Sequence, residues 1–338
     1  MQSDSFIKNV LALSGIITIA ESSIQLQAEV FMDLPRHAYF LGKIVPFEDA
    51  KVSVATHAFN YGTAVFGGLR GYWNDEQKKM FVFRPLDHFR RLMNSAKMMC
   101  METEHTPESL TEITLELLKT DGWQRDIYIR PLIYKSDLGI GVRLHDLTDS
   151  VTIFTLPSTQ YIKNDTSAHA TVSSWRRVDD NVIPARGKVS GAYANSALIK
   201  TEAARAGFDE ALVLNQDGHV SEGSAMNVFM VRDGVVITPP VTDNILEGIT
   251  RRSIIELARN ELGLTVVERS IDRTELFIAE ELFMTGTAAQ MVAVTRVDFR
   301  SVGSGTMGPV TADLRTRYED ILRGRNPKYA KWIVSVPK

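Results

Sequence analysis

The chain has 338 residues, of which 44% are hydrophobic and 23% are charged, a composition typical of a folded globular protein. Its 38 basic and 41 acidic residues leave a net charge of -3. This balance excludes the large basic field that attracts nucleic acid or an anionic membrane, so we expect small-molecule partners and neither of those two. A chain of this length exceeds one ordinary hydrophobic core, and we therefore expect two domains.

The N-terminal region and the cysteine content bear on location. The single cysteine, Cys100, can form neither an internal disulfide nor a thiolate zinc site, which favours a reduced, cytoplasmic protein without a bound metal. The apolar run over residues 9–20 is too short to span a bilayer, which takes about 20 residues. Asp4 before this run and Glu21 after it are unlike the flanks of a signal peptide. We expect residues 1–37 to be an extension outside the fold.

Residues 38–157 are expected to form the smaller domain, of α+β type. Short apolar stretches broken by turn residues predict antiparallel strands over residues 38–47, 51–59, 69–73, 79–84, 127–135 and 150–157. Apolar residues at helical spacing predict helices over residues 87–99 and 108–122, with Gly122 as the end of the second. The polar and irregular residues 158–167 are the expected interdomain linker.

Residues 168–338 are expected to form the larger, cofactor-binding domain. Two Asp-Gly turns, at residues 217–218 and 233–234, predict consecutive hairpins that form an antiparallel meander. The hydrophobic pattern predicts further strands over residues 170–178, 265–271, 282–287 and 291–297, and helices over residues 193–207, 249–263 and 274–281.

Four short glycine-containing segments carry the candidate chemistry: Lys188 in ARGKVSG, Glu222 in HVSEGS, Gly248 at a helix start in LEGITR, and the strand end MTGTAA. Taken singly, each has a plain structural explanation, namely a surface lysine, a hairpin acid facing water, a helix start and a tight loop. Together they supply an amine for an imine, an acid for a ring nitrogen and two sets of backbone N–H groups for anions. This combination predicts a pyridoxal phosphate site.

These segments belong to a longer series of motifs: HAFNYGTAVFGGLRGYW, HFRRLMNSAKMM, YIRPLIYKSDLGIGV, the Lys188 segment, HVSEGSAMNVF, LEGITRRSI and MTGTAAQMVAV. In their order and spacing, from about residue 38 to the C-terminal region, the chain resembles fold type IV pyridoxal-phosphate enzymes. It most resembles the branched-chain amino acid aminotransferases. The resemblance implies a D-amino acid aminotransferase-like fold of two domains, with pyridoxal 5'-phosphate at their interface.

The resemblance also implies roles for individual residues. Lys188 would form the internal aldimine and shuttle the proton, Arg91 would pair with the phosphate, and Glu222 would hold the ring nitrogen protonated. The full set of cofactor-binding residues would be Arg91, Lys188, Tyr193, Glu222, Ile249, Thr250 and Thr287. The substrate-binding residues would be Tyr61, Phe66, Tyr128, Arg130, Val142 and Ala288. The family further implies a homodimer or higher homo-oligomer, in which residues 138–142 close on the neighbour's site.

The implied reaction is a double-displacement transamination between L-leucine, L-isoleucine or L-valine and 2-oxoglutarate, which gives branched 2-oxo acids and L-glutamate. Two positions depart from the family pattern: Gly67 stands where glutamate is usual, and Ser158 follows Pro157 where tryptophan is usual. Tyr161 is a further candidate for the pocket. The alternatives within the fold are a D-amino acid or (R)-amine transaminase and an aminodeoxychorismate lyase, and outside it a catalytically silent binding protein.

Overall fold

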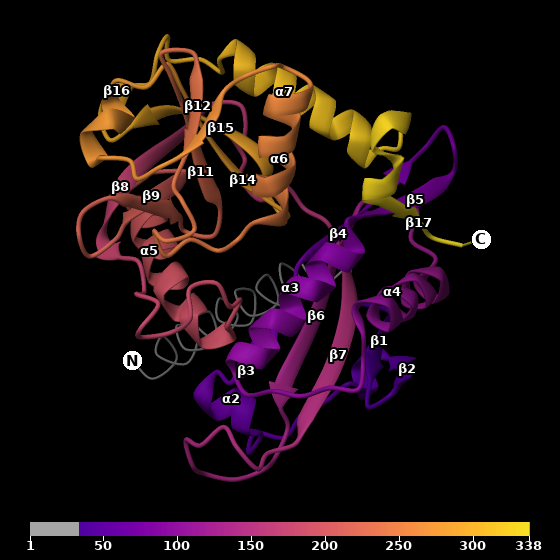
Figure 1. Cartoon of the computed structure of the whole chain (residues 1–338). Coiled ribbons are helices and arrows are strands. Elements are labelled where there is room, and N and C mark those ends of the chain that lie inside the picture. The colour runs from indigo at the N-terminus through magenta and orange to yellow at the C-terminus, as the bar shows by residue number, and fades with distance from the viewer. Residues whose placement is uncertain (1–33, 338) are drawn as a thin grey trace, which may run out of the picture. The chain divides into compact units, whose positions relative to one another are not determined.

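The computed structural model describes residues 34–337 (Figure 1). The extension predicted over residues 1–37 lies outside the described residues as far as residue 33, and a first strand already begins at His37. Between residues 34 and 337, no helix combines the length and the apolar character needed to cross a membrane.

The first sheet has eight strands, and all of its paired strands are antiparallel. Its main path runs β17-β5-β4-β6-β7-β1-β2, and β3 pairs with β6. The strands are β1 His37–Phe40, β2 Lys43–Pro46, β3 Ala64–Phe66, β4 Leu69–Asn74, β5 Lys79–Phe83, β6 Ile127–Lys135, β7 Asp149–Pro157 and β17 Ile333–Ser335. The C-terminal β17 thus returns to the sheet that is otherwise built from the first half of the chain.

Two helices, α3 Pro85–Met98 and α4 Pro107–Asp121, pack together against the first sheet. A capping box starts α4, because Thr106 and Ser109 bond each other's backbone N–H groups through their side chains. Gly122 ends it in the left-handed region at φ 62°, as predicted. Three short helical elements occur along the chain: η1 Phe47–Asp49 and α2 His57–Tyr61 between β2 and β3, and η2 Ser190–Ala192 after β8.

The second sheet has nine strands, along the path β10-β9-β8-β15-β14-β11-β12-β13, and β16 pairs with β15. The strands are β8 Ala168–Arg176, β9 Glu210–Leu214, β10 Val220–Gly223, β11 Asn227–Arg232, β12 Val235–Thr238, β13 Val266–Glu268, β14 Glu281–Gly286, β15 Gln290–Val297 and β16 Arg300–Ser301. The helical elements that accompany it are α5 Tyr193–Arg205, α6 Ile249–Asn260, η3 Arg273–Phe277, α7 Pro309–Leu322 and η4 Pro327–Trp332.

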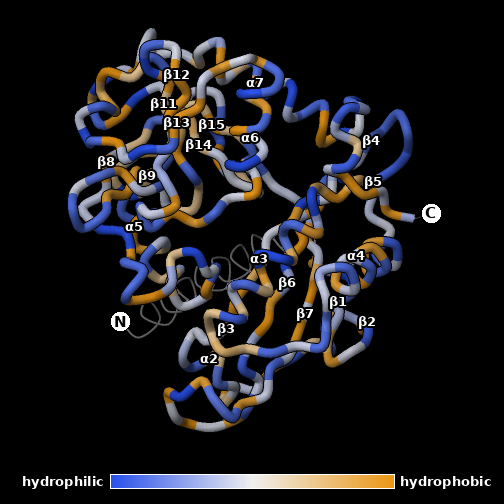
Figure 2. The backbone as a smooth tube through the Cα atoms, in the orientation of Figure 1, coloured by the Kyte–Doolittle hydropathy of each residue, from blue (hydrophilic) through white to orange (hydrophobic). Residues whose placement is uncertain are grey.

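Strand β11 is buried on both faces because its side chains alternate between two hydrophobic cores. Val228 and Met230 belong to one core, whereas Phe229 and Val231 belong to the other, which α6 and α7 cover. Figure 2 shows hydrophobic residues along the central strands of both sheets. The strands that carry cavity residues are therefore anchored in buried cores.

Three predictions of local structure are wrong. Residues 51–59 form no strand, and the end of this segment belongs to α2. The Asn60 amide of α2 donates to the carbonyl oxygens of Val54 and Thr56, and Gly62 ends the helix at φ 66°. The two hairpins form as predicted, but they make no meander, because β11 pairs with the distant β14 and β8 pairs in parallel with β9. The helix predicted over residues 274–281 is the shorter 3-10 helix η3.

The predicted linker, residues 158–167, contains no helix or strand, since β7 ends at Pro157 and β8 begins at Ala168. Ile162 within it is nevertheless buried in the core of the second sheet. Strand β17, near the C-terminus, pairs with β5 of the first sheet, so the two sheets do not correspond to two continuous halves of the chain. The domain boundaries therefore stay a prediction.

Phe229 and Phe283 stack in the core of the second sheet, with ring centroids 5.0 Å apart. We expect Phe229→Ala to lower the free energy of unfolding by about 3–5 kcal/mol, through lost burial and a residual cavity. Phe299, which is 85% exposed, is the control, and Phe299→Ala is expected to cost less than about 0.5 kcal/mol. Denaturant unfolding measures both values, and equal losses would contradict the assignment of this core.

Candidate active site

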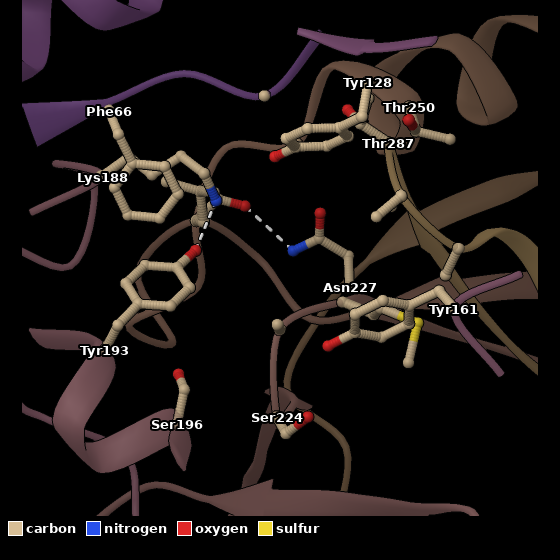
Figure 3. Close-up of a pocket in the computed structure, with 18 of the residues that line it drawn as sticks. Phe66, Tyr128, Tyr161, Lys188, Tyr193, Ser196, Ser224, Asn227, Thr250 and Thr287 are labelled. Atoms are coloured by element: carbon tan, nitrogen blue, oxygen red, sulfur yellow. Dashed lines mark hydrogen bonds between the residues drawn. The ribbon is translucent and has the colours of Figure 1, made fainter. Parts of the chain in front are cut away.

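A cavity of about 730 Å³ is lined by side chains from both sheets. Figure 3 shows Lys188 between Phe66 and Tyr193, on one side of the cavity, with Tyr128, Thr250 and Thr287 on another side. Eleven residues predicted for the site line it: Phe66, Arg91, Tyr128, Arg130, Lys188, Tyr193, Glu222, Ile249, Thr250, Thr287 and Ala288. The fold thus brings together residues from seven separate segments.

The backbone of Lys188 is held by elements of the first sheet. Its carbonyl oxygen accepts a bond from Phe66 N at 3.0 Å, and its N–H donates to the hydroxyl of Ser95, on α3, at 3.0 Å. Val189 forms an isolated bridge with Val65 of β3. The Nζ atom of Lys188 is hydrogen-bonded to the hydroxyl of Tyr193, at the start of α5. Lys188 is therefore a fixed cavity residue and no surface lysine.

Burial lowers the pKa of Lys188 well below its usual value, and the nearby cations Arg91 and Arg130 lower it further, while Glu222 acts in the opposite direction. Burial and the Glu222 charge raise the pKa of Tyr193. Near neutral pH these shifts favour an uncharged amine beside an intact phenol. Such an amine has the free lone pair that a nucleophile or a general base needs.

Glu222 is buried, with 4% of its surface exposed, at the end of β10. The β9–β10 register shifts between Val220 and Glu222, an irregularity of the kind that redirects a side chain. Arg177 pairs with one carboxylate oxygen at 2.9 Å. Burial raises the pKa of Glu222, whereas Arg177 and the Leu246 N–H lower it. Glu222 is therefore a buried acid that lines the cavity, and the alternative of a hairpin acid facing water is wrong.

The start of helix α6 also lines the cavity and offers hydrogen-bond donors suited to an anion. Helix α6 begins after Gly248, and the first-turn N–H groups of Ile249 and Thr250 have no carbonyl partner within the helix. Arg91 reaches this end from α3 and donates to the Glu247 carbonyl oxygen at 2.9 Å. A side chain at position 248 would not fit, because a Cβ there would lie 2.0 Å from the Asn227 Oδ1 atom.

A second polar group lies beside aromatic rings. Arg130 donates to the Tyr128 hydroxyl at 3.3 Å, and its guanidinium carbon is 4.5 Å from the centre of the Phe66 ring. The Nε atom of Arg130 is buried without a hydrogen-bond partner. Ala288 also lines the cavity, and its carbonyl oxygen accepts a bond from Arg70, the neighbour of Tyr128 in the sheet, at 3.1 Å. This arrangement offers both a cation and apolar surface to a ligand.

Two predicted substrate residues do not line this cavity. The Tyr61 hydroxyl accepts a bond from Gly141 N at 3.0 Å, and Val142 is 80% exposed. Both therefore belong to a neighbouring unit formed by α2 and residues 138–142. Of the two positions that depart from the family pattern, Ser158 lines the cavity, while Gly67 does not and lies against the Pro131 ring.

Several cavity residues were missed by the sequence analysis. They are Arg177, Ser196, Ser224, Asn227 and Thr285, and the hydroxyls of Ser224 and Thr285 are buried without a hydrogen-bond partner. Asn227 follows Glu222 within the quoted HVSEGSAMNVF motif, so proximity was a usable signal for it. Arg177 lies eleven residues before Lys188 in WRRV, and no local pattern distinguishes it from a surface arginine. Tyr161, the further candidate, does line the cavity.

Comparison with known proteins identifies the family. The family model described as amino-transferase class IV matches residues 65–297. The chain belongs to this family. It is 45% identical over 299 residues to the probable branched-chain-amino-acid aminotransferase of Aquifex aeolicus, covering 88% of this chain and 96% of that one. It is 38% identical over 304 residues to the branched-chain-amino-acid aminotransferase of Escherichia coli K12, covering 89% and 97%.

Solved structures of branched-chain aminotransferases share the fold. The branched-chain aminotransferase of Thermoproteus uzoniensis with norvaline superimposes with a TM-score of 0.86 at 39% identity, over 90% of this chain and 100% of that one. The branched-chain amino acid aminotransferase of Thermobaculum terrenum in its PLP-form gives 0.86 at 38% identity, over 90% and 99%. The predicted fold class is confirmed.

Removing a cation from the cavity of this aminotransferase should make Lys188 easier to protonate. We expect Arg130→Met to raise the pKa of Lys188 by about one, since a like charge is lost from a buried site. The pH dependence of Lys188 acylation, measured by peptide mapping, gives this value. Arg186→Met is the control, because Arg186 flanks Lys188 but pairs with Glu247 and Asp180. An unchanged titration in Arg130→Met would contradict the electrostatic account.

Proposed function

We propose that this class IV aminotransferase exchanges the amino group of L-branched-chain amino acids with 2-oxoglutarate, using pyridoxal 5'-phosphate. The observation that carries the proposal is the shared cavity in which the amine of Lys188, the carboxylate of Glu222 and the N-terminus of α6 face one ligand-sized space. The relatives named above are branched-chain aminotransferases, and they support this substrate class over the alternatives within the fold.

The residues present fit the cofactor. The phosphate, with nearly two negative charges, would be held by Arg91 and by the free N–H groups at Ile249 and Thr250. The unpartnered Thr285 hydroxyl, near Thr287, adds a hydrogen-bonding group at the cavity wall. Gly248 leaves room beside the helix start for the Asn227 amide, which also lines the cavity.

When bound, the cofactor supplies an aldehyde and an electron-withdrawing ring for amino-group transfer. Lys188 provides the amine that holds the cofactor and, once released, the base that accepts and returns a proton at Nζ. Tyr193 orients that nitrogen through its hydroxyl. Glu222 offers a buried carboxylate to the protonated ring nitrogen.

The substrate side must accept both an apolar side chain and the second carboxylate of glutamate. Phe66, Leu156 and Met226 give the cavity apolar surface, while Arg130 and the Tyr128 hydroxyl provide charge and hydrogen bonds for a carboxylate. The Nε atom of Arg130, buried without a partner, leaves one further donor for such a group.

The reaction is tested with L-leucine and 2-oxoglutarate as the substrates. We expect glutamate to form and initial rates to give parallel lines in a two-substrate plot, because in a double displacement the first product leaves before the second substrate binds. Lys188→Ala is expected to lose more than about a thousandfold in rate. Turnover of D-alanine or of an (R)-amine, with L-leucine inert, would instead indicate the alternative transaminases.

Arg91 is expected to act on cofactor retention. Arg91→Ala should release pyridoxal phosphate at least about tenfold more readily, since a charge-assisted contact with a phosphate is lost. The dissociation constant is measured by titrating the cofactor into dialysed protein. Arg90→Ala is the control, because Arg90 neighbours Arg91 on α3 but lies outside the cavity and contacts Asp87. Equal affinities in the two variants would argue against the phosphate assignment.

We also propose that the enzyme is a cytoplasmic homodimer or higher homo-oligomer. Residues 138–142 expose Leu138, Ile140 and Val142, the second at 87%, and Phe59 of α2 exposes a further apolar ring. Bonds from Gly139 N to the Ala55 carbonyl oxygen and from the His57 ring to the Gly141 carbonyl oxygen hold this unit together. Its contact with a neighbour's site would account for Tyr61 and Val142 lying outside this chain's cavity. Sedimentation and cell fractionation measure assembly and location.

A further inference from the structure

The carboxylate of Glu222 is held by three donors of two kinds. One oxygen pairs with the guanidinium of Arg177 at 2.9 Å. The other accepts from the Asn227 amide at 3.1 Å and from the Leu246 N–H at 3.2 Å. The charged contact and the neutral contacts therefore divide between the two oxygens.

Arg177 makes further hydrogen bonds besides its contact with the Glu222 carboxylate. Its Nε donates to the Asn244 carbonyl oxygen at 3.1 Å, and its backbone N–H donates to the Leu214 carbonyl oxygen at 2.9 Å. Its side chain is 12% exposed and lines the cavity. The guanidinium is thus bonded through Nε to Asn244 and through a terminal nitrogen to Glu222, so it cannot turn away from Glu222 without breaking a buried contact.

Asn227 links Glu222 to the segment that leads into α6. Its Nδ2 atom donates to Glu222 and also, at 2.9 Å, to the carbonyl oxygen of Leu246, three residues before the start of α6. Its Oδ1 atom occupies the space that a side chain at Gly248 would need. Figure 3 shows Asn227 pointing into the cavity. The acid and the helix start are thus joined through one amide.

We propose that Arg177 and Asn227 are positioning residues for Glu222: Arg177 holds its negative charge, and Asn227 fixes its orientation relative to the N-terminus of α6. The proposal rests on the proposed function, because it assigns the two residues to the acid that would face the cofactor ring. It adds two residues to the site that contact neither the predicted nucleophile nor the predicted substrate groups.

The electrostatic balance supports this assignment. Burial raises the pKa of Glu222, and Arg177 is the largest influence that lowers it, ahead of Lys188 and Arg91; the Tyr193 phenol also faces it. Lys188 itself favours the uncharged form, so it contributes little charge near neutral pH. Arg177, in direct contact, is then the permanent cation on which ionisation of Glu222 depends.

The test measures the pKa of the Glu222 carboxyl group directly. In the full-length protein, labelled with ¹³C at the glutamate side-chain carboxyl, the Glu222 signal is assigned by its loss in Glu222→Gln and titrated with pH. We expect the pKa of Glu222 to rise by about 1–3 in Arg177→Met, since an opposite charge is lost, and to return most of the way in Arg177→Lys. Arg232→Met is the matched control, because Arg232 ends the same strand as Asn227 and pairs with Glu275 outside the cavity.

Asn227→Leu keeps the approximate shape of the side chain and removes the donor without adding a charge, and we expect it also to raise the pKa of Glu222. This variant keeps the test decisive if Arg177→Met does not fold. A second readout is the ¹⁵N signal of labelled pyridoxal phosphate in the holoenzyme, which should move toward the unprotonated ring in Arg177→Met and not in Arg232→Met.

An unchanged Glu222 titration in Arg177→Met or in Asn227→Leu would overturn the proposal, as would an equal shift in Arg232→Met. The carboxyl titration needs neither turnover nor bound cofactor. A protein inactive with L-leucine, but with the expected carboxyl shifts, would therefore contradict the proposed function and leave the roles of Arg177 and Asn227 standing.

Discussion

The site depends on how one short segment is attached. The main chain of Lys188 is bonded to β3 and α3 of the first sheet, while its side chain lies among residues carried by the second. The distance from its amine to Glu222 is therefore set by the docking of the two sheets, and neither sheet fixes it alone.

The charges that share the cavity give it a consistent electrostatic character. Arg91, Arg130, Arg177 and Lys188 line the same space as Glu222. Burial is the largest cause of the lowered pKa of Lys188, and the neighbouring cations Arg91 and Arg130 lower it further. The same surplus of positive charge suits a phosphorylated cofactor and substrates that carry one or two carboxylates.

The errors of the sequence analysis share a physical cause. Residues 51–59 have the alternation of a strand, yet they form no strand, and their last residues begin α2. The Asn60 side chain of α2 bonds back to the carbonyl oxygens of Val54 and Thr56. The hairpins β9–β10 and β11–β12 were predicted from Asp-Gly turns, but their placement within the sheet depends on β14 and β15, which are distant in sequence. Periodicity reports which face is buried and carries no information on the partner.

By itself the sequence determined most of the helices and strands, the four glycine-containing segments and, through their order, the family, because local backbone preferences and the chemistry of single side chains are encoded there directly. It also singled out Lys188, Glu222 and the helix start at Gly248, all of which line the cavity. Only the tertiary structure decided that Arg177 and Asn227 hold Glu222, and that Tyr61 and Val142 lie outside this chain's cavity. Such contacts join residues from separate strands and loops, so they exist only once both sheets have formed.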